Sequence, residues 1–418
     1  MAAWLEAMDA VLWGHGLVAM ILMMGTFCLT YGRFLPIRSL HALCCRDRSG
    51  GHGQTPFQAC MTSLAAAMGT GNIVGVTAAL AAGGPGAILW MWAAAVPGMG
   101  LIYAENVLAA RYRRGETAGA VAYLRWGLGS RGMAAGFAVC CVAASFGMGD
   151  MVQSRAMAGT LAAAYGVPPL VTGLAAAAVT AVVVFGGAGR TGRFTAHVMP
   201  LVTLVYLLAA AVVTARGTVP LGDVLHTIVT DALDLRAAAG GVGGAALAVG
   251  VRRGVFSNEA GLGSSGLLHA DADTASPAFL GACAMLEVAA DTLVCCTATA
   301  FAVLTSGVPV GDSAETVYAA FRTGIGGAAD WLLPPVIAVF ALCTLVGWCH
   351  CGSHALRGLT GGRGLGVYRA AFCLAAVIGA CTGESLVWTL ADIANACMAW
   401  INLPGILLLW PKTARQAP

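Results

Sequence analysis

Met68-Gly-Thr-Gly-Asn-Ile-Val-Gly75 is the stretch that decides the fold, and it lies inside an apolar segment (residues 57–82) long enough to cross a bilayer. Its three glycines, threonine and asparagine disfavour a continuous helix. Hydrocarbon supplies no hydrogen-bond partners, so the freed backbone groups must face a cavity, an ion or a ligand. A break of this kind is typical of the discontinuous helices of membrane transporters.

The composition around this stretch is that of a polytopic membrane protein. Hydrophobic residues make up 59% of the 418 residues and charged residues 10%, and the mean hydropathy is +0.81. The net charge is only +3, and the sequence has no basic tail or patch, which argues against a nucleic-acid partner. The 15 cysteines lie mostly in apolar segments, where they behave as small hydrophobes and do not suggest disulfides.

Hydropathy predicts an all-α protein with eleven transmembrane helices, of which the fourth and eighth are longer than a bilayer requires. The expected spans are residues 12–31, 57–82, 86–110, 133–164, 168–188, 197–215, 237–263, 277–305, 331–355, 367–383 and 387–410. With the N-terminus outside, sixteen of the 22 Lys and Arg residues fall in inside segments and three, Arg216, Arg236 and Arg322, in outside segments. The positive-inside rule therefore predicts a cell (plasma or inner) membrane protein with a cytoplasmic C-terminus.

A second glycine-rich interruption, Gly250–Gly261, lies in the seventh expected span. Each interrupted span leads a group of five crossings, and an odd number makes the second group inverted relative to the first. Asn72 precedes the intramembrane Glu105 by 33 residues, and Asn258 precedes Asp291 by the same interval. The chain therefore reads as one transporter domain with inverted repeats at 57–215 and 237–410, preceded by an extra helix at 12–31.

The first interruption is a candidate binding site. Neighbouring N–H groups at Thr70 and Gly71, placed at the start of a half-helix, suit a carboxylate. The Asn72 amide and nearby backbone carbonyls suit a hard cation, here expected to be Na+, and those carbonyls belong to Ala65, Ala67 and Met68. Close helix packing is the alternative, although packing faces space their small residues four apart.

Three acidic residues within the spans, Glu105, Glu287 and Asp291, are functional candidates because charge is costly in a bilayer. The alternative is structural pairing with Arg252, Arg253 or backbone groups around the interrupted spans.

The fourth span carries Asp150, Gln153 and Arg155, of which Gln153 is the best ligand contact because an amide both donates and accepts. Phe146 and Trp348, with Phe256, are candidates for the wall of a small substrate site, although single aromatic residues in a span more often face lipid or the core.

Cys349-His-Cys351 followed by His354 suggests a soft-metal cluster, but only His350 and His354 share a helix face. The sequence contains no nucleotide-binding P-loop, His-Glu-x-x-His pair or nucleophile elbow, so we expect neither an ATP-driven pump nor an enzyme.

Several longer motifs resemble the alanine/glycine:cation symporter family. They are Gly69-Thr-Gly-Asn-Ile-Val-Gly-Val76, Gly83-Gly-Pro-Gly-Ala-Ile-Leu-Trp-Met-Trp92, Arg253-Gly-Val-Phe-Ser-Asn-Glu-Ala-Gly-Leu-Gly-Ser264, Asp291-Thr292 and Asn402-Leu-Pro404. The resemblance covers nearly the whole chain and implies the five-plus-five inverted-repeat fold of sodium-coupled amino-acid transporters.

The resemblance also implies residue roles and a function. Thr70 and Gly71 hold the substrate carboxylate, Asn72 lies near ligand and ion, and Gln153 and Trp348 complete the pocket. Cys343-Thr344 stands where the family has two hydroxyl residues that coordinate Na+, and a neutral thiol is a poor ligand for a hard cation.

The predicted function is import of a small neutral amino acid, alanine or glycine, with Na+ as the co-transported ion and no other cofactor. The predicted partners are this amino acid, Na+ and the lipid bilayer. Three alternatives remain: a proton-coupled or uncoupled amino-acid carrier, a transport-inactive amino-acid receptor, and a metal carrier that uses His350 and His354.

Overall fold

The computed structural model describes residues 2–32, 35–38, 40, 54–233, 242–273, 276–311 and 314–415. Regular structure in these residues is helical, apart from two isolated bridges at Gln54–Ala272 and Arg114–Thr117. The prediction of an all-α protein is confirmed. Residues 237–241 of the seventh expected span, and Arg33, Arg46, Arg48 and Arg236 of the charge pattern, lie outside the described residues.

Seven helical stretches within the described residues are long and apolar enough to cross a membrane. Each coincides with an expected span: Ala7–Tyr31, Gly86–Tyr112, Arg131–Tyr165, Ala188–Ala215, Pro277–Ser306, Ala328–Thr360 and Thr389–Ala414. The fourth and eighth expected spans are indeed long, at 35 and 30 residues.

These stretches contain the following helices: α1 (Ala2–Leu12) and α2 (His15–Tyr31); α6 (Gly86–Tyr112); α8 (Arg131–Phe146) and α9 (Val152–Tyr165), joined by the π-helical segment Gly147–Met151; α11 (Ala188–Ala215); α16 (Pro277–Val288) and α17 (Thr297–Ser306), joined by the π-helical segment Ala289–Cys296; α19 (Ala328–Thr360); and α21 (Glu384–Ala414).

The other four expected spans are shorter or interrupted helices. Two are single apolar helices of 16 and 17 residues, α10 (Pro169–Val184) and α20 (Leu365–Cys381). Of the remaining two, the span at 57–82 is divided into α4 (Pro56–Ala67) and α5 (Val74–Gly83). The span at 237–263 holds α14 (Val242–Asn258), followed by a non-helical segment that leads to the short helix α15 (Ser265–Leu268). The interruption expected at Gly69–Gly75 is therefore present, whereas the chain is helical from Gly250 to Asn258 and the second break begins only at Glu259.

Local sequence accounts for the ends of the first broken helix. Thr55 and Gln58 form a reciprocal capping box at the start of α4, with Pro56 in the first turn. The helix ends at Ala67 because Met68 turns to ψ 90°, and a short 3₁₀ turn over Thr70–Asn72 leads into α5.

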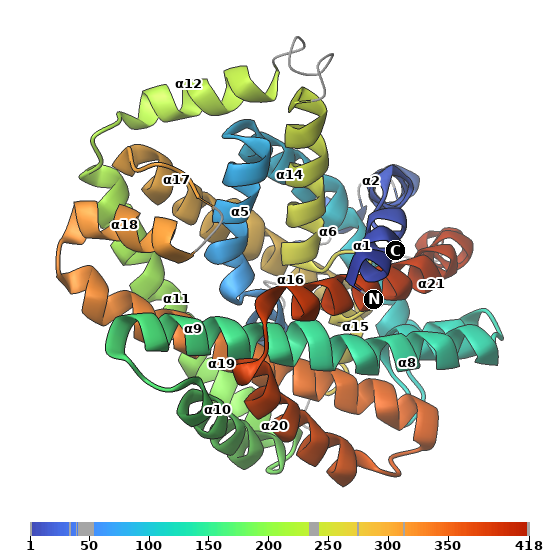
Figure 1. Cartoon of the computed structure of the whole chain (residues 1–418). Helices are drawn as coiled ribbons and strands as arrows, with labels where there is room; N and C mark the ends of the chain where they lie inside the picture. Colours follow the sequence, from blue (N-terminus) through green and yellow to red (C-terminus); the bar gives the residue numbers. More distant parts are fainter. Residues whose placement is uncertain are drawn as a thin grey trace.

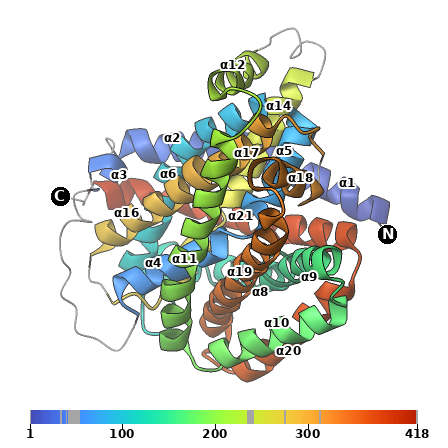
Figure 2. The same cartoon turned by 90° about the vertical axis from the view of Figure 1, so that its left-hand side faces the viewer.

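The two broken helices meet in the interior (Figure 1). The α5 helix packs against α14, which also packs along α6, while α4 lies between α11, α16 and α19. Figure 2 shows α10 and α20 paired on one flank of the molecule, beside α9. This arrangement brings the interruptions of α4–α5 and α14–α15 together beside α16 and α19.

Short helices complete the fold: α3 (Leu35–Arg38), α7 (Gly119–Ala122), α12 (Leu221–Ala232) and α18 (Ala314–Ile325). The α12 helix lies across the end of α6 (Figure 1), where the Asp231 carboxylate accepts a hydrogen bond of 2.7 Å from the Gly86 N–H. A carboxylate at the start of a helix satisfies a free donor and complements the helix dipole.

Candidate functional site

The break in the first interrupted helix is crowded at Gly69. A β-carbon at this position would lie 2.7 Å from Thr344 Oγ1 and 3.0 Å from Gln153 Oε1. Glycine is therefore required here by the close approach of α19 and α9. At Gly71, by contrast, an added β-carbon would meet no heavy atom within 4 Å.

Gln153 on α9 binds the donors of Thr70. Its Oε1 accepts hydrogen bonds from the Thr70 backbone N–H at 3.2 Å and from the Thr70 hydroxyl at 2.9 Å. Its Nε2 donates to the Met148 carbonyl at 3.3 Å. Both residues are buried, so the structure brings together two predicted substrate contacts that are 83 residues apart in the chain.

A hydroxyl from α19 meets two free carbonyl groups of α4. Thr344 Oγ1 donates to the Ala65 carbonyl at 3.0 Å and lies 3.5 Å from the Met68 carbonyl. It also lies 3.2 Å from the Phe340 carbonyl of its own helix. Cys343 is fully buried in the apolar cluster that includes Ala65 and Met68. Three oxygen atoms, from Ala65, Met68 and Thr344, therefore lie close together here, with the buried thiol of Cys343 in the adjoining apolar cluster.

Asn72 connects the break to a second polar cluster, since its Oδ1 accepts a hydrogen bond from the Gly69 N–H at 3.1 Å. Its Nδ2 donates to Asp291 Oδ1 at 2.5 Å, and Asp291 Oδ2 accepts from the hydroxyls of Ser257 at 2.7 Å and Thr292 at 3.0 Å. All four residues are buried. Ser257 and Thr292 were not among the predicted site residues, although the motifs Phe256-Ser-Asn258 and Asp291-Thr292 contained them.

The second interruption contains a strained residue that the sequence reasoning missed. Glu259 has φ 56°, the one positive φ at a non-glycine position in the described residues. Its Oε1 accepts from Trp348 Nε1 at 3.2 Å, and its Oε2 accepts from Ser264 Oγ at 2.5 Å. A buried carboxylate with two donors restrains this conformation. The signal was present in the motif Asn258-Glu-Ala-Gly261.

The two predicted aromatic residues lie in different environments. Trp348 is fully buried beside the interruption, packed so closely against Gly149 that a β-carbon there would lie 2.2 Å from Trp348 Cβ. Phe146 instead packs on α20, with ring centroids 5.5 Å from Tyr368 and 5.8 Å from Phe372. Phe256 lies 6.5 Å from the ring of Trp13.

One alternative paired Arg252 with the intramembrane acids Glu105, Glu287 or Asp291. Arg252 instead forms ion pairs with Asp9 at 2.9 Å and Asp392 at 2.7 Å.

Glu105 accepts a hydrogen bond from Asn402 Nδ2 at 2.6 Å, and Asn402 also donates to the Gly261 carbonyl. Glu105 is therefore linked to the second interruption through the Asn402 amide.

Glu287 lies between the hydroxyl of Ser63 on α4, at 2.6 Å, and His269 Nε2, at 3.0 Å. Burial opposes the charged form of His269, but the adjacent Glu287 carboxylate outweighs burial and raises the pKa of His269 to about 9. A charged pair thus links the segment after α15 to α16.

In the fourth span, Asp150 and Arg155 form separate contacts. Asp150 is fully buried and accepts from Ser154 Oγ at 3.3 Å, while its Oδ2 has no hydrogen-bond partner among the described residues. Arg155 donates to the Ala380 carbonyl at 3.5 Å.

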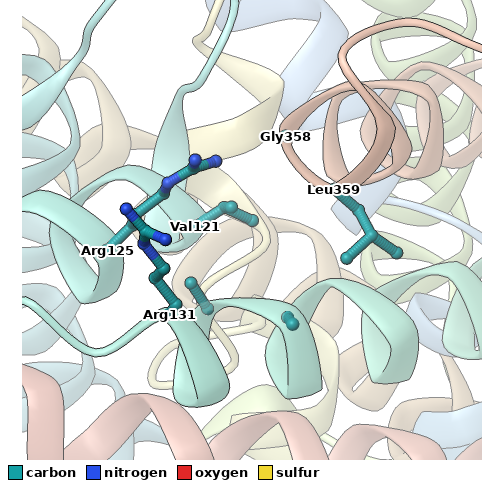
Figure 3. Close-up of a pocket in the computed structure, with 7 residues that line it drawn as sticks. Val121, Arg125, Arg131, Gly358 and Leu359 are labelled. Atoms are coloured by element: carbon teal, nitrogen blue, oxygen red, sulfur yellow. The ribbon is translucent and has the colours of Figure 1, made fainter.

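The space between the two interruptions is small. A cavity of about 10 Å³, roughly the room for one water molecule, lies beside residues from both broken helices: Ser63, Ala67, Ile102, Asn258, Glu259, Ser265, Glu287 and Asp291. A larger cavity of about 180 Å³, shown in Figure 3, lies between Arg125, Arg131 and Leu359. Leu359 is eleven residues beyond Trp348 on α19, about 16 Å along the helix, so this second cavity is separate from the interruptions.

The fold is shared with a solved structure. MhsT, crystallised with L-phenylalanine, superposes with a TM-score of 0.68 at 14% sequence identity, over 88% of this chain and 97% of MhsT. Two interrupted helices that meet at a buried polar site in an all-helical membrane fold are typical of secondary transporters.

The family follows from the sequence. The model of the sodium:alanine symporter family matches residues 1–417, so the chain belongs to this family. AgcS of Methanococcus maripaludis, a sodium/alanine symporter, is 37% identical over 97% of this chain and 94% of AgcS. AlsT of Bacillus subtilis, an amino-acid carrier protein, is 36% identical over 86% of this chain and 79% of AlsT. The protein is therefore a multi-pass cell-membrane transporter of the sodium-coupled amino-acid symporter class and not an enzyme, as the motifs predicted.

Proposed function

We propose that this protein imports alanine or glycine together with Na+ by alternating access. The observation that carries the proposal is the pair of Thr70 donors, N–H and hydroxyl, aimed at one side-chain oxygen of Gln153. A carboxylate is the natural competitor for two such donors at the end of a broken helix. In this proposal the substrate carboxylate takes the place of the Gln153 oxygen, and Gln153 turns to bind the substrate.

The close packing around the interruption supports a small substrate. Gly69 has no room for a β-carbon, and Trp348 packs directly on Gly149. A pocket opened by modest movement of these elements accommodates a hydrogen or methyl side chain more readily than a large one. The name of AgcS, a sodium/alanine symporter, points to the same substrate class.

The cation is assigned to the oxygen atoms of Ala65, Met68 and Thr344. Two backbone carbonyls and a hydroxyl are hard ligands that suit Na+ and do not suit a soft metal. The Asn72 amide lies between this point and the neighbouring polar cluster, since its Oδ1 accepts from the Gly69 N–H and its Nδ2 donates to Asp291. Cys343 packs beside the oxygen ligands and is not expected to bind the ion.

For the membrane arrangement we infer eleven crossings, with the N-terminus outside and the C-terminus in the cytoplasm. The helix at 12–31 precedes inverted repeats at 57–215 and 237–410. Support comes from the matched interruptions that lead the two halves and from the distribution of Lys and Arg. Alternating access then consists of one helical group rocking against the other around the fixed site.

Proton coupling is the second candidate, favoured by one observation. Asp150 Oδ2 is buried without a hydrogen-bond partner among the described residues, three positions before Gln153. A carboxyl group in such a place is a candidate proton carrier.

Counterflow and uptake in proteoliposomes distinguish the two candidates. Labelled alanine and glycine are offered with an inward Na+ gradient, with an inward proton gradient, and with neither. Uptake driven by the Na+ gradient at constant pH supports the proposal. Uptake that follows the pH gradient and ignores Na+ contradicts it and supports the role of Asp150. Absence of counterflow for both amino acids contradicts the proposed substrate.

A further inference from the structure

Two histidines and an aspartate meet where α19 faces the segment between α15 and α16. His350 and His354 lie one turn apart on α19, and Asp271 lies three residues after the end of α15. His354 Nε2 is 2.9 Å from Asp271 Oδ2, and His350 Nε2 is 3.6 Å from the same oxygen. One candidate ligand atom from each residue lies within 4.8 Å of the other two.

This spacing fits a tetrahedral metal ion. Ligands bonded to one such ion at about 2.0–2.1 Å lie roughly 3.3 Å apart, which falls between the two measured distances. Two imidazoles and one carboxylate suit Zn²⁺ and its neighbours in the transition series. The histidine side chains are 6% and 5% exposed, whereas the Asp271 side chain is 19% exposed and leaves a route for the ion.

The imidazoles have unused nitrogen atoms. His350 Nε2, which faces the carboxylate, has no hydrogen-bond partner in the described part of the chain. His354 Nδ1 is likewise buried without one. An unpartnered buried polar atom is costly, and coordination of an ion by His350 Nε2 removes that cost. Arg357 and Arg369 contribute positive charge near His350, which the Asp271 carboxylate offsets.

A second group of potential ligands is less suitable. Cys60, His269 and Glu287 also lie within 4.8 Å of one another. However, His269 Nδ1 already lies 3.0 Å from the Ser265 carbonyl, and its Nε2 lies 3.0 Å from Glu287 Oε1. Both ring nitrogens of His269 therefore already have partners, whereas His350 Nε2 at the first site has none among the described residues.

The metal cluster suggested by the sequence is therefore different in composition from this site. Cys351 Sγ lies 3.8 Å from the Ser264 carbonyl and 3.7 Å from Cys141 Sγ, away from the histidines. The third ligand instead comes from Asp271, 79 residues before His350.

We propose that Asp271, His350 and His354 bind one divalent transition-metal ion of the Zn²⁺ type, with water in the remaining position. Asp271 pairs through its carbonyl with the Gln54 N–H at 2.8 Å, and Asp273 N–H pairs with the Gln54 carbonyl at 2.9 Å. Gln54 stands two residues before α4. The bound ion therefore links α19 to the start of the first broken helix.

Zinc binding to the purified full-length protein tests the proposal, independently of any transport activity. Calorimetry and competition with a chromophoric chelator are expected to show one equivalent of Zn²⁺ bound at micromolar affinity. Asp271→Asn, His350→Ala and His354→Ala should each weaken binding at least tenfold. His197→Ala, which removes an exposed histidine of α11, is the matched control and should bind as the wild type does.

Three results overturn the proposal: no binding by the wild-type protein, equal binding by all three site variants, or loss of binding in His269→Ala alone. A fourth variant guards against misfolding. His354→Cys replaces imidazole with thiolate, so the preference for Cd²⁺ over Zn²⁺ should rise at least tenfold. Unfolding also exposes native cysteines that prefer Cd²⁺, so circular dichroism and size-exclusion chromatography first show that the variant is folded. An unchanged ratio in the folded variant counts against the site.

Discussion

Gln153 Oε1 accepts hydrogen bonds from both the backbone N–H and the hydroxyl of Thr70, a residue 83 positions earlier in the chain. At the interruption of the first broken helix, two hydrogen-bond donors of Thr70 thus share one uncharged acceptor, the Gln153 side-chain oxygen. The charge at this point should decide whether a carboxylate substrate can bind.

Gln153→Glu is expected to raise the KM for alanine at least tenfold. The new carboxylate holds the Thr70 donors more strongly and repels the substrate carboxylate. Initial rates of uptake in proteoliposomes measure the effect. Gln58→Glu is the matched control, because glutamate preserves the capping box at the start of α4. A KM in Gln153→Glu equal to that of the wild type would contradict the assignment of Thr70 to the substrate site.

Gly69→Ala should abolish uptake and destabilise the protein by about 1–3 kcal/mol, the usual cost of overpacking. The added methyl group collides with Thr344 Oγ1 at 2.7 Å and Gln153 Oε1 at 3.0 Å. Thermal unfolding in detergent and uptake report the two effects. Gly159→Ala on α9, where a β-carbon meets nothing within 4 Å, should be neutral or stabilising by about 0.5–1 kcal/mol. Equal behaviour of the two variants contradicts the close packing at Gly69.

Substitutions at the neighbouring positions 343 and 344 should change Na+ affinity in opposite directions. Thr344→Ala removes one oxygen ligand, so the Na+ concentration for half-maximal uptake should rise roughly tenfold, as expected for one contact to a charge. Cys343→Ser adds a hydroxyl beside the Ala65 and Met68 carbonyls and should lower that concentration. Thr227→Ala, on the exposed face of α12, is the control. If the Na+ dependence of uptake is unchanged in both variants, the proposed cation site at these residues is wrong.

The His269–Glu287 pair should make stability depend on pH. The pKa of His269 is raised to about 9, above the ordinary value of 6.5. The pair therefore contributes fully below pH 6.5, and its contribution is lost as the pH rises through 9. The difference in melting temperature between the wild type and His269→Gln should be largest near pH 6 and shrink by pH 10. A difference that grows with pH has the wrong sign for this pair.

Much of the fold could be predicted because its signals are local. The apolar runs placed seven full-length helices, and Gly69–Gly75 marked the first interruption. The stretch Gly250–Gly261 was only partly right, because α14 continues to Asn258 and the second break begins at Glu259. Glycine content and missing hydrogen bonds act within a few residues of the chain, so a helix break can be predicted without knowing which other helices it contacts. The short helices α12 and α18 escaped notice because neither is long enough to register as a span.

The faces of the helices could not be predicted in the same way. A helix that is apolar all round carries no periodic signal to show which side meets the protein interior. Phe146 and Trp348 looked equivalent in sequence, yet one packs on α20 and the other touches Glu259. Rotation of a span is decided by packing against its neighbours.

The sequence by itself thus determined the membrane class, the family and the place where the first helix breaks, since composition and motifs are properties of the chain. Only the tertiary structure decided which groups meet there: Gln153 with Thr70, Asp291 with Asn72 across 219 positions, and Asp271 with the two histidines of α19. The physical reason is that hydrogen bonds and coordination act over about 3 Å in space. Packing of the helices, rather than separation along the chain, brings their partners within that range.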